Sequence, residues 1–126
     1  MRYRDTVSLL LELAWVARVL PRVERDRRTL GPLPAVDAAR ARSRGAPARS
    51  SAERALLRRA VAAADARLPG GANCLRRALL EISLDAGAAS EPLHLYLATD
   101  GSPGSGHARL ASWAEDGRTF EAHFVI

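Results

Sequence analysis

The spacing of the apolar residues changes along this chain, and that change constrains the fold more than any other feature. Up to about residue 85 the apolar side chains recur every three or four residues, which is the period of amphipathic helices. After Pro92 they alternate, because His94 and Tyr96 separate Leu93, Leu95 and Leu97, and this is the period of a half-buried strand. The sequence therefore predicts an α+β fold in which N-terminal helices precede a small antiparallel sheet.

The helical part divides at proline and glycine residues. Two helices, over 6–20 and 21–30, are expected to meet at a kink beside Pro21. Residues 31–50 contain three prolines, two glycines and no sustained apolar period, so they are predicted to form a loop or a mobile linker. Ser50 and Glu53 have the spacing of a capping box, which predicts a helix over 51–67 with a buried face made of Leu56, Ala60, Val61 and Ala64.

A further helix and three strands complete the prediction. Asn73 is a candidate N-cap for a helix over 74–85. Strands are expected from residue 93 to 98, from 107 to 113 and from 119 to 126. A flexible loop over 100–106 should connect the first two strands, and a turn over 115–117 should join the last two as a hairpin.

The length of 126 residues predicts one compact unit. Within it, residues 1–50 form a helical, arginine-rich N-terminal segment with a linker, and residues 51–126 form the core that carries the chemistry. All 19 basic residues are arginine. Residues 1–60 contain 14 of them and only 6 acidic residues, so this half of the chain is strongly basic. Such a front half suits an acidic partner. A basic nucleic-acid-binding domain remains a minor alternative, because the chain lacks a recognition motif and its aromatic content is only 5%.

The apolar stretch over 7–20 does not predict a membrane span or a signal peptide. It is too short to cross a bilayer, and Glu12 and Arg18 interrupt it. Trp15 and Trp113 are expected in the core, although the wide apolar stripe of the first helix leaves room for a partner or for self-association. The single cysteine excludes an intrachain disulfide. We therefore expect a cytoplasmic protein.

Cys74 stands where a nucleophile would be placed. It falls in the first turn of a predicted helix, where unpaired N–H groups and the helix dipole favour a thiolate. Gly70 and Gly71 precede it, and its own N–H could face a developing oxyanion. The alternative is that Cys74 is a small buried hydrophobic residue.

His107 makes the catalytic interpretation stronger. It opens a predicted strand 33 residues after Cys74, and a thiol needs such a base or imidazolium partner to react near neutral pH. A single histidine would more often be structural or exposed. The pair is better evidence than either residue alone.

The stretch RLPGGANCLRRALLE, the strand LHLYLAT, a glycine-rich loop, GHARL and a D-G turn resemble the leader peptidases of lasso-peptide biosynthesis, a transglutaminase-like family of cysteine peptidases. In that family Cys-Leu-x-Arg opens the catalytic helix and His-Ala-Trp-Leu opens the catalytic strand. The first motif is matched by Cys74, Leu75 and Arg77, and the second by His107, Ala108 and Leu110. The apolar and then arginine-rich opening of the chain is also similar to that family.

The resemblance implies a transglutaminase-like, papain-like core and proteolysis of a ribosomally made precursor peptide without a cofactor. Cys74 would attack the carbonyl at the junction of leader and core peptide, and His107 would activate the thiol and protonate the leaving amine. The implied partners are the precursor, a separate leader-recognition protein and the lasso cyclase, with no nucleic acid and no membrane. The alternatives are a catalytically impaired peptide-binding homologue and an acyl-transfer enzyme of the same fold.

The third catalytic residue departs from the family pattern. Aligned on the D-G turn, the family aspartate falls on Ala122, and Arg109 stands where the family has tryptophan. A three-residue hairpin loop would put Glu121 and His123 on the face of His107, whereas a two-residue loop would turn Glu121 away. Glu121 is therefore the preferred third residue and Asp116 the fallback, and Glu121 could also be a merely exposed strand residue.

Two further residues are candidates for oxyanion or substrate contacts. Asn73 adjoins Cys74 and its amide could face an oxyanion, although it could serve only as a helix cap. Tyr96 carries a hydroxyl near the expected cleft. His94 and His123 match no metal-binding spacing with Cys74 and His107, so no metal site is predicted.

Overall fold

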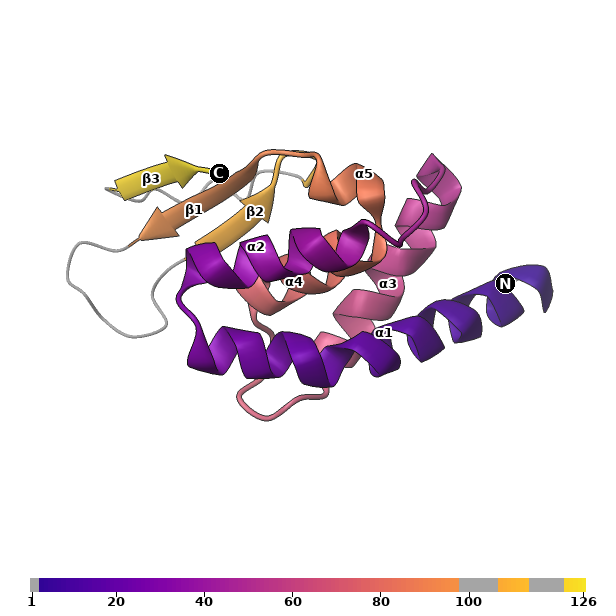
Figure 1. The fold of residues 1–126 in the computed structure, drawn as a ribbon. Helices are drawn as coiled ribbons and strands as arrows, with labels where there is room; N and C mark the ends of the chain where they lie inside the picture. The colour runs from indigo at the N-terminus through magenta and orange to yellow at the C-terminus, as the bar shows by residue number, and fades with distance from the viewer. Residues whose placement is uncertain (1–2, 98–106, 114–121) are drawn as a thin grey trace.

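The computed structural model describes residues 3–97, 107–113 and 122–126 and shows an α+β fold, as the change of period predicts. Helices make up the first part of this chain, and a three-stranded antiparallel sheet follows them (Figure 1). The elements are α1 Tyr3–Thr29, α2 Pro32–Ser43, α3 Ser51–Ala66, α4 Cys74–Leu84, α5 Ala86–Ala89, β1 Leu93–Leu97, β2 His107–Leu110 and β3 Ala122–Val125.

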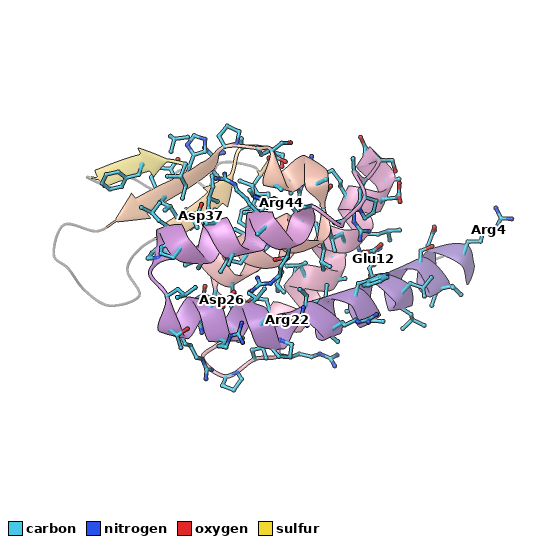
Figure 2. All side chains as sticks on the ribbon, viewed as in Figure 1. Arg4, Glu12, Arg22, Asp26, Asp37 and Arg44 are labelled. Carbon is cyan, nitrogen blue, oxygen red and sulfur yellow. The ribbon has the colours of Figure 1, made fainter. Side chains whose placement is uncertain are left out.

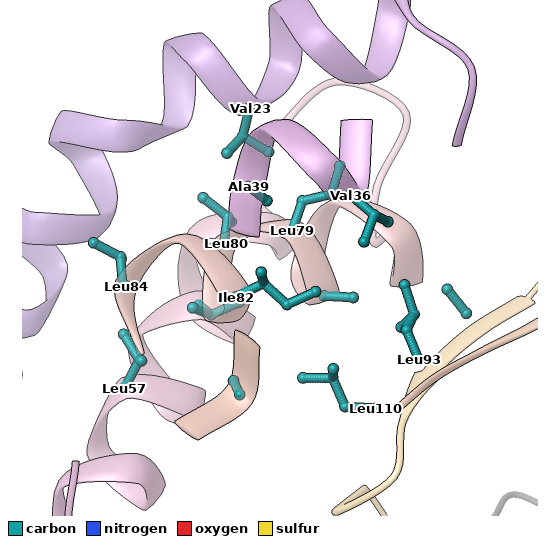
Figure 3. Close-up of a cluster of buried hydrophobic side chains, with 14 of the residues drawn as sticks. Val23, Val36, Ala39, Leu57, Leu79, Leu80, Ile82, Leu84, Leu93 and Leu110 are labelled. Atoms are coloured by element: carbon teal, nitrogen blue, oxygen red, sulfur yellow. The ribbon is translucent and has the colours of Figure 1, made fainter. Parts of the chain in front are cut away.

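Helix α4 is the centre of the fold. It contacts α1, α2, α3 and α5, and β2 packs against it from the sheet (Figure 1). Its apolar side chains are largely buried, with Leu79 and Leu80 at most 1% exposed. The core around it draws on both halves of the chain (Figure 3) and includes Val16, Val23, Val36, Ala39, Leu57, Ile82, Leu84, Leu93 and Leu110.

Helix α1 runs without interruption through Pro21, so the predicted division into two helices at this residue is wrong. Proline removes one backbone hydrogen bond from a helix interior, and that cost must be offset by packing. Val16 and Val23 supply the packing, because they lie two turns apart on one helix face and are both fully buried on either side of the proline.

Residues 32–43 form helix α2, so the predicted loop or linker over 31–50 is also wrong for this stretch. Pro32 and Pro34 fall in the first turn, where a proline removes no hydrogen bond that the helix would make. Ala35, Val36 and Ala39 then follow at helical spacing and are buried against α4. Because these side chains are small, their spacing predicts a buried helix face only weakly. They are buried because α4 packs closely against them.

The two predicted helix starts are confirmed. Ser50 and Glu53 form a capping box at α3, in which each side chain bonds to the backbone N–H of the other. Asn73 caps α4 through its side-chain oxygen. The buried face of α3 differs from the prediction, because it includes Leu57 and Asp65 in place of Leu56 and Ala64.

The strand order is β2–β1–β3, which contradicts the predicted hairpin between the last two strands. Strand β1 lies between them and pairs antiparallel with both (Figure 1). Leu93 is paired with Leu110 of β2, and its backbone exchanges two hydrogen bonds with Ile126 just after β3. The leucine-rich β1 therefore takes the central place, where a strand gains hydrogen bonds on both sides.

The first turns of α1 extend beyond the rest of the fold (Figure 1). Leu11 is 59% exposed and Trp15 is 50% exposed, so the prediction that Trp15 lies in the core is wrong. Trp113 is half-buried and packs against the core without belonging to it, so its predicted core position is confirmed only in part. Within the described part of the chain, no helix is both long and apolar enough to span a lipid bilayer.

Candidate active site

Cys74 is the first residue of α4 and lies beside the outer edge of the sheet. Among the strands that the structure describes, β2 is at the edge of the sheet, and one side of its backbone pairs with none of the others. On β2 the N–H of Ala108 donates a hydrogen bond to the Cys74 sulfur, with an N to Sγ distance of 3.2 Å. The cysteine thus occupies the junction between the start of the central helix and the strand that His107 opens.

This hydrogen bond brings the backbone of His107 close to the sulfur. Standard backbone dimensions place a Cα about 2.4 Å from the following nitrogen, so His107 Cα lies within about 5.6 Å of Cys74 Sγ. A side chain of the length of histidine can cross that distance. The structure therefore brings together the two residues that sequence reasoning singled out, 33 positions apart.

The imidazole of His107 lies on the other face of β2 from the core. Successive strand residues point to opposite faces, and Ala108 is buried in the core at 2% exposure. The His107 ring packs beside the Tyr96 ring, with centroids 5.9 Å apart. Among the described residues no hydrogen bond joins this imidazole to Cys74, whose sulfur is instead bonded to the N–H of Ala108.

A buried ion pair fixes the turn before Cys74. Arg76 Nε lies 2.6 Å from the Asp65 carboxylate, and both side chains are 1% exposed. The same guanidinium donates to the carbonyl oxygens of Asp65 and Gly71. Gly70 and Gly71 have φ values of 87° and 75°, a left-handed conformation that glycine adopts without strain.

Sequence reasoning missed the role of Arg76, although its position carries a signal. Leu79 and Leu80 lie three and four residues after Arg76 and are buried, so Arg76 lies on the same apolar face of α4. A charged residue on such a face needs a buried partner. Asp65 supplies it from α3, and Glu24 of α1 adds a contact of 3.3 Å.

Glu24 is itself held as a carboxylate. A hydrogen bond from Arg27 is the largest influence and lowers the pKa of Glu24, with burial opposing it and the charges of Arg27 and Arg76 adding to the decrease. The result is that α1 contributes a negative charge beside Arg76 over the ordinary pH range. Helices α1, α3 and α4 are therefore joined by charge close to the start of α4.

Asn73 serves mainly to position Cys74. Its side-chain oxygen accepts from the N–H of Arg76 at 2.9 Å, and its own N–H donates to both oxygens of Asp65. The oxygen is thus engaged in the helix cap. The side-chain NH₂ is the part of Asn73 that can face a bound carbonyl oxygen.

Arg109 fills the position where the resembling family has tryptophan, and it is buried at 8% exposure. One of its terminal nitrogens donates to the Tyr96 hydroxyl at 3.3 Å, and the other donates to the Trp113 carbonyl at 3.2 Å. Tyr96 in turn contacts the His107 ring. Arg109 therefore links the ring beside His107 to the segment that follows β2.

Trp113 connects this segment back to α4. Its indole N–H donates to Glu81 at 2.7 Å, and the Arg77 guanidinium lies 5.3 Å from the centre of a Trp113 ring. Arg77, the arginine of the Cys-Leu-x-Arg pattern, thus stacks on Trp113. Burial raises the pKa of Glu81, and the hydrogen bond and charge of Arg58 partly oppose that rise.

Asp116 and Glu121, the fallback and the preferred third catalytic residue, lie outside the described residues. The shared face of Glu121, His123 and His107 was predicted from a hairpin between the last two strands. These strands do not pair, because β1 lies between β2 and β3. In the observed register His107 and His123 both stand opposite Tyr96, one on each side of β1. Among the described residues, no three His, Cys, Asp or Glu side chains gather as a metal-binding set.

Compared with protein-family models, with curated proteins and with solved structures, the chain matches none. The site is therefore interpreted from its own residues. It combines a thiol at a helix start, a histidine backbone beside that thiol and first-turn N–H groups that the helix leaves unpaired. Such a set can carry out nucleophilic attack on a carbonyl carbon.

Proposed function

We propose that this protein is a cytoplasmic cysteine endopeptidase with a transglutaminase-like core, which removes the leader from a lasso precursor peptide together with a separate leader-recognition protein. The observation that carries the proposal is the 3.2 Å hydrogen bond from Ala108 to the Cys74 sulfur. It supports the pairing of Cys74 with His107, on which a thiol nucleophile depends.

The reaction begins when His107 takes the thiol proton and the Cys74 sulfur bonds to the scissile carbonyl carbon. The carbonyl oxygen becomes an oxyanion, and in this proposal the N–H of Cys74 and the side-chain NH₂ of Asn73 stabilise it. His107 then gives its proton to the leaving amine as the peptide bond breaks. Water hydrolyses the resulting thioester and regenerates the thiol, so atoms and protons balance.

The proposed mechanism requires the imidazole to turn from the Tyr96 ring toward the sulfur. The bond from Ala108 holds the sulfur at the edge of β2, and a rotation about the His107 side-chain bonds swings the ring from Tyr96 toward that edge. Glu121 is the proposed orienting acid, with Asp116 as the fallback. The proposed reaction uses no cofactor.

The test is cleavage of a lasso precursor peptide in the presence of a leader-recognition protein, with products followed by mass. Cys74→Ala and His107→Ala should each lower the cleavage rate by at least about a thousandfold. His94→Ala is the matched control, because His94 also has its ring near Tyr96, with centroids 6.3 Å apart, but stands opposite Arg109 on β2. Release of an intact leader by the Cys74→Ala protein would exclude the peptidase.

A second measurement needs no partner. Iodoacetamide alkylates Cys74 at a rate that rises with pH. We expect this pH dependence to differ from the wild type in His107→Ala and to equal that of the wild type in His94→Ala. Identical pH dependences for all three proteins would show that His107 does not act on the thiol.

The orienting acid is tested by precursor cleavage. Cleavage by Glu121→Gln at the wild-type rate would move the orienting role to Asp116 or to no acid.

A catalytically impaired peptide-binding homologue is the second candidate. It is favoured by the packing of the His107 ring on Tyr96 and by the bond that the Cys74 sulfur accepts from Ala108. This candidate predicts that the precursor binds without being cut, and that alkylation of Cys74 does not depend on His107.

A further inference from the structure

A cleft among the described residues lies away from Cys74, at the other end of α4. It has a volume of about 490 Å³, and its walls come from α1, from the end of α2 and the segment after it, and from the last residues of α4. Helix α4 has 11 residues, so this end lies about 15 Å from the catalytic candidate. The cleft is therefore separate from the proposed active site.

Four arginines line this cleft, and no acidic residue does. Two of them already have partners, since Arg42 is paired with Asp26 and Arg49 is paired with Glu12. The other two, Arg18 and Arg22, are exposed on α1 (Figure 2 labels Arg22). Neither makes an ion pair with a described residue, and Arg18 instead lies 5.6 Å from the centre of a Trp15 ring.

The same face of α1 changes from apolar to basic along its length. Leu11, Trp15, Arg18 and Arg22 are spaced by four, three and four residues, so they form one stripe. Leu11 and Trp15 are 59% and 50% exposed, and Trp15 is also part of the cleft wall. An exposed tryptophan beside unpaired arginines provides the two kinds of contact that anchor a peptide.

We propose that this cleft, together with the stripe Leu11, Trp15, Arg18 and Arg22, binds an acidic peptide segment in which apolar side chains adjoin two or more carboxylates. The apolar residues would cover Leu11 and Trp15, and the carboxylates would pair with Arg18 and Arg22 inside the cleft. This binding does not depend on the peptidase activity, because the cleft and the thiol lie at opposite ends of α4.

Charge and shape favour a peptide over the other occupants. A second copy of this chain that docked its own stripe in parallel would bring Arg18 and Arg22 against the same two arginines, and like charges would oppose it. An anionic membrane is a flat surface and would contact only the exposed stripe. It could not reach Arg42 and Arg49, which line the cleft. A peptide can enter a cleft of this size and neutralise it.

The probe for this proposal is a phage-displayed library of random peptides about 12 residues long, selected on the Cys74→Ala protein, which cannot cleave them. Selected sequences are then made as fluorescein-labelled peptides for titration. We expect enrichment of apolar residues next to Asp or Glu, in either order. The Arg18→Glu, Arg22→Glu double variant should bind these peptides at least about tenfold more weakly, and added salt should weaken binding to the parent protein.

The matched control is Arg4→Glu with Arg59→Glu, which changes the net charge equally at two exposed arginines outside the cleft. Its affinity for the peptides should match that of the parent protein. The proposal is overturned if the two double variants bind alike, if the selected peptides are not acidic, or if phosphatidylserine vesicles are bound and peptides are not. Self-association that Trp15→Glu abolishes would also overturn it, by assigning the stripe to a second copy.

Discussion

The guanidinium of Arg76 and the carboxylate of Asp65 form an ion pair that is almost fully buried, with Nε 2.6 Å from Oδ1. Asp65 also accepts from the N–H of Asn73, the residue before Cys74. The pair thereby joins the end of α3 to the start of α4. We regard it as the main reason why Cys74 has a defined place in the fold.

Removing one partner should destabilise the protein strongly, because the other charge would be left buried and unpaired. Arg76→Ala is expected to lower the free energy of unfolding by about 3–5 kcal/mol, measured by urea unfolding. The double variant Asp65→Leu, Arg76→Met should lose distinctly less, since it leaves no unpaired charge. Equal losses in the two proteins would contradict this account.

The N–H of Ala108 should matter for the reactivity of Cys74. Ala108→Pro removes this donor on the unpaired side of an edge strand, where proline interrupts no strand pairing. We expect the pH dependence of Cys74 alkylation to change and precursor cleavage to slow by about tenfold or more. Ala108→Gly keeps the N–H and is the control, and a thermal unfolding curve for each protein shows whether β2 is intact.

Glu81 should give the protein a characteristic dependence on pH. Burial raises the pKa of Glu81 above its usual value of 4.5, with Arg58 opposing the change. A carboxyl with a higher pKa in the folded state contributes stability that is present below the unfolded value and is lost as pH rises through the folded value. Glu81→Gln removes this loss.

The measurement is the urea unfolding midpoint of both proteins from about pH 4 to about pH 7. The midpoint of Glu81→Gln, taken relative to the wild type, should increase across that range. A difference that stays constant with pH would show that burial does not raise this pKa. Glu91 is a useful contrast, because hydrogen bonds from Ser112 and Arg54 overcome the effect of burial and lower the pKa of Glu91.

Helix α2 can be tested by a buried and an exposed position of similar chemistry. Val36 is fully buried, whereas Leu33 is 54% exposed on the same helix. Val36→Ala should lower the free energy of unfolding by about 2 kcal/mol, and Leu33→Ala should change it by less than about 0.5 kcal/mol. If residues 32–43 were a solvated linker, neither substitution would alter the urea midpoint.

The sequence alone determined the fold class, the helix starts at Ser50 and Asn73, and the presence of a cysteine at a helix start. These features depend on local rules, because a cap needs residues within one turn and an amphipathic helix needs only its own spacing. The candidate pair Cys74 and His107 was also found this way. That prediction assumed only that the strand beginning at His107 packs beside the start of the helix at Cys74.

Only the tertiary structure decided the remaining features, since each depends on partners distant in the chain. Pro21 stays inside a helix because buried valines flank it, and α2 forms because α4 covers its small side chains. The central place of β1 depends on pairing with two strands at once, which no single strand encodes. The buried Arg76 and the arginine-lined cleft likewise arise where separate elements meet. The spacing of residues within one element does not predict the contacts between elements that are distant in the sequence.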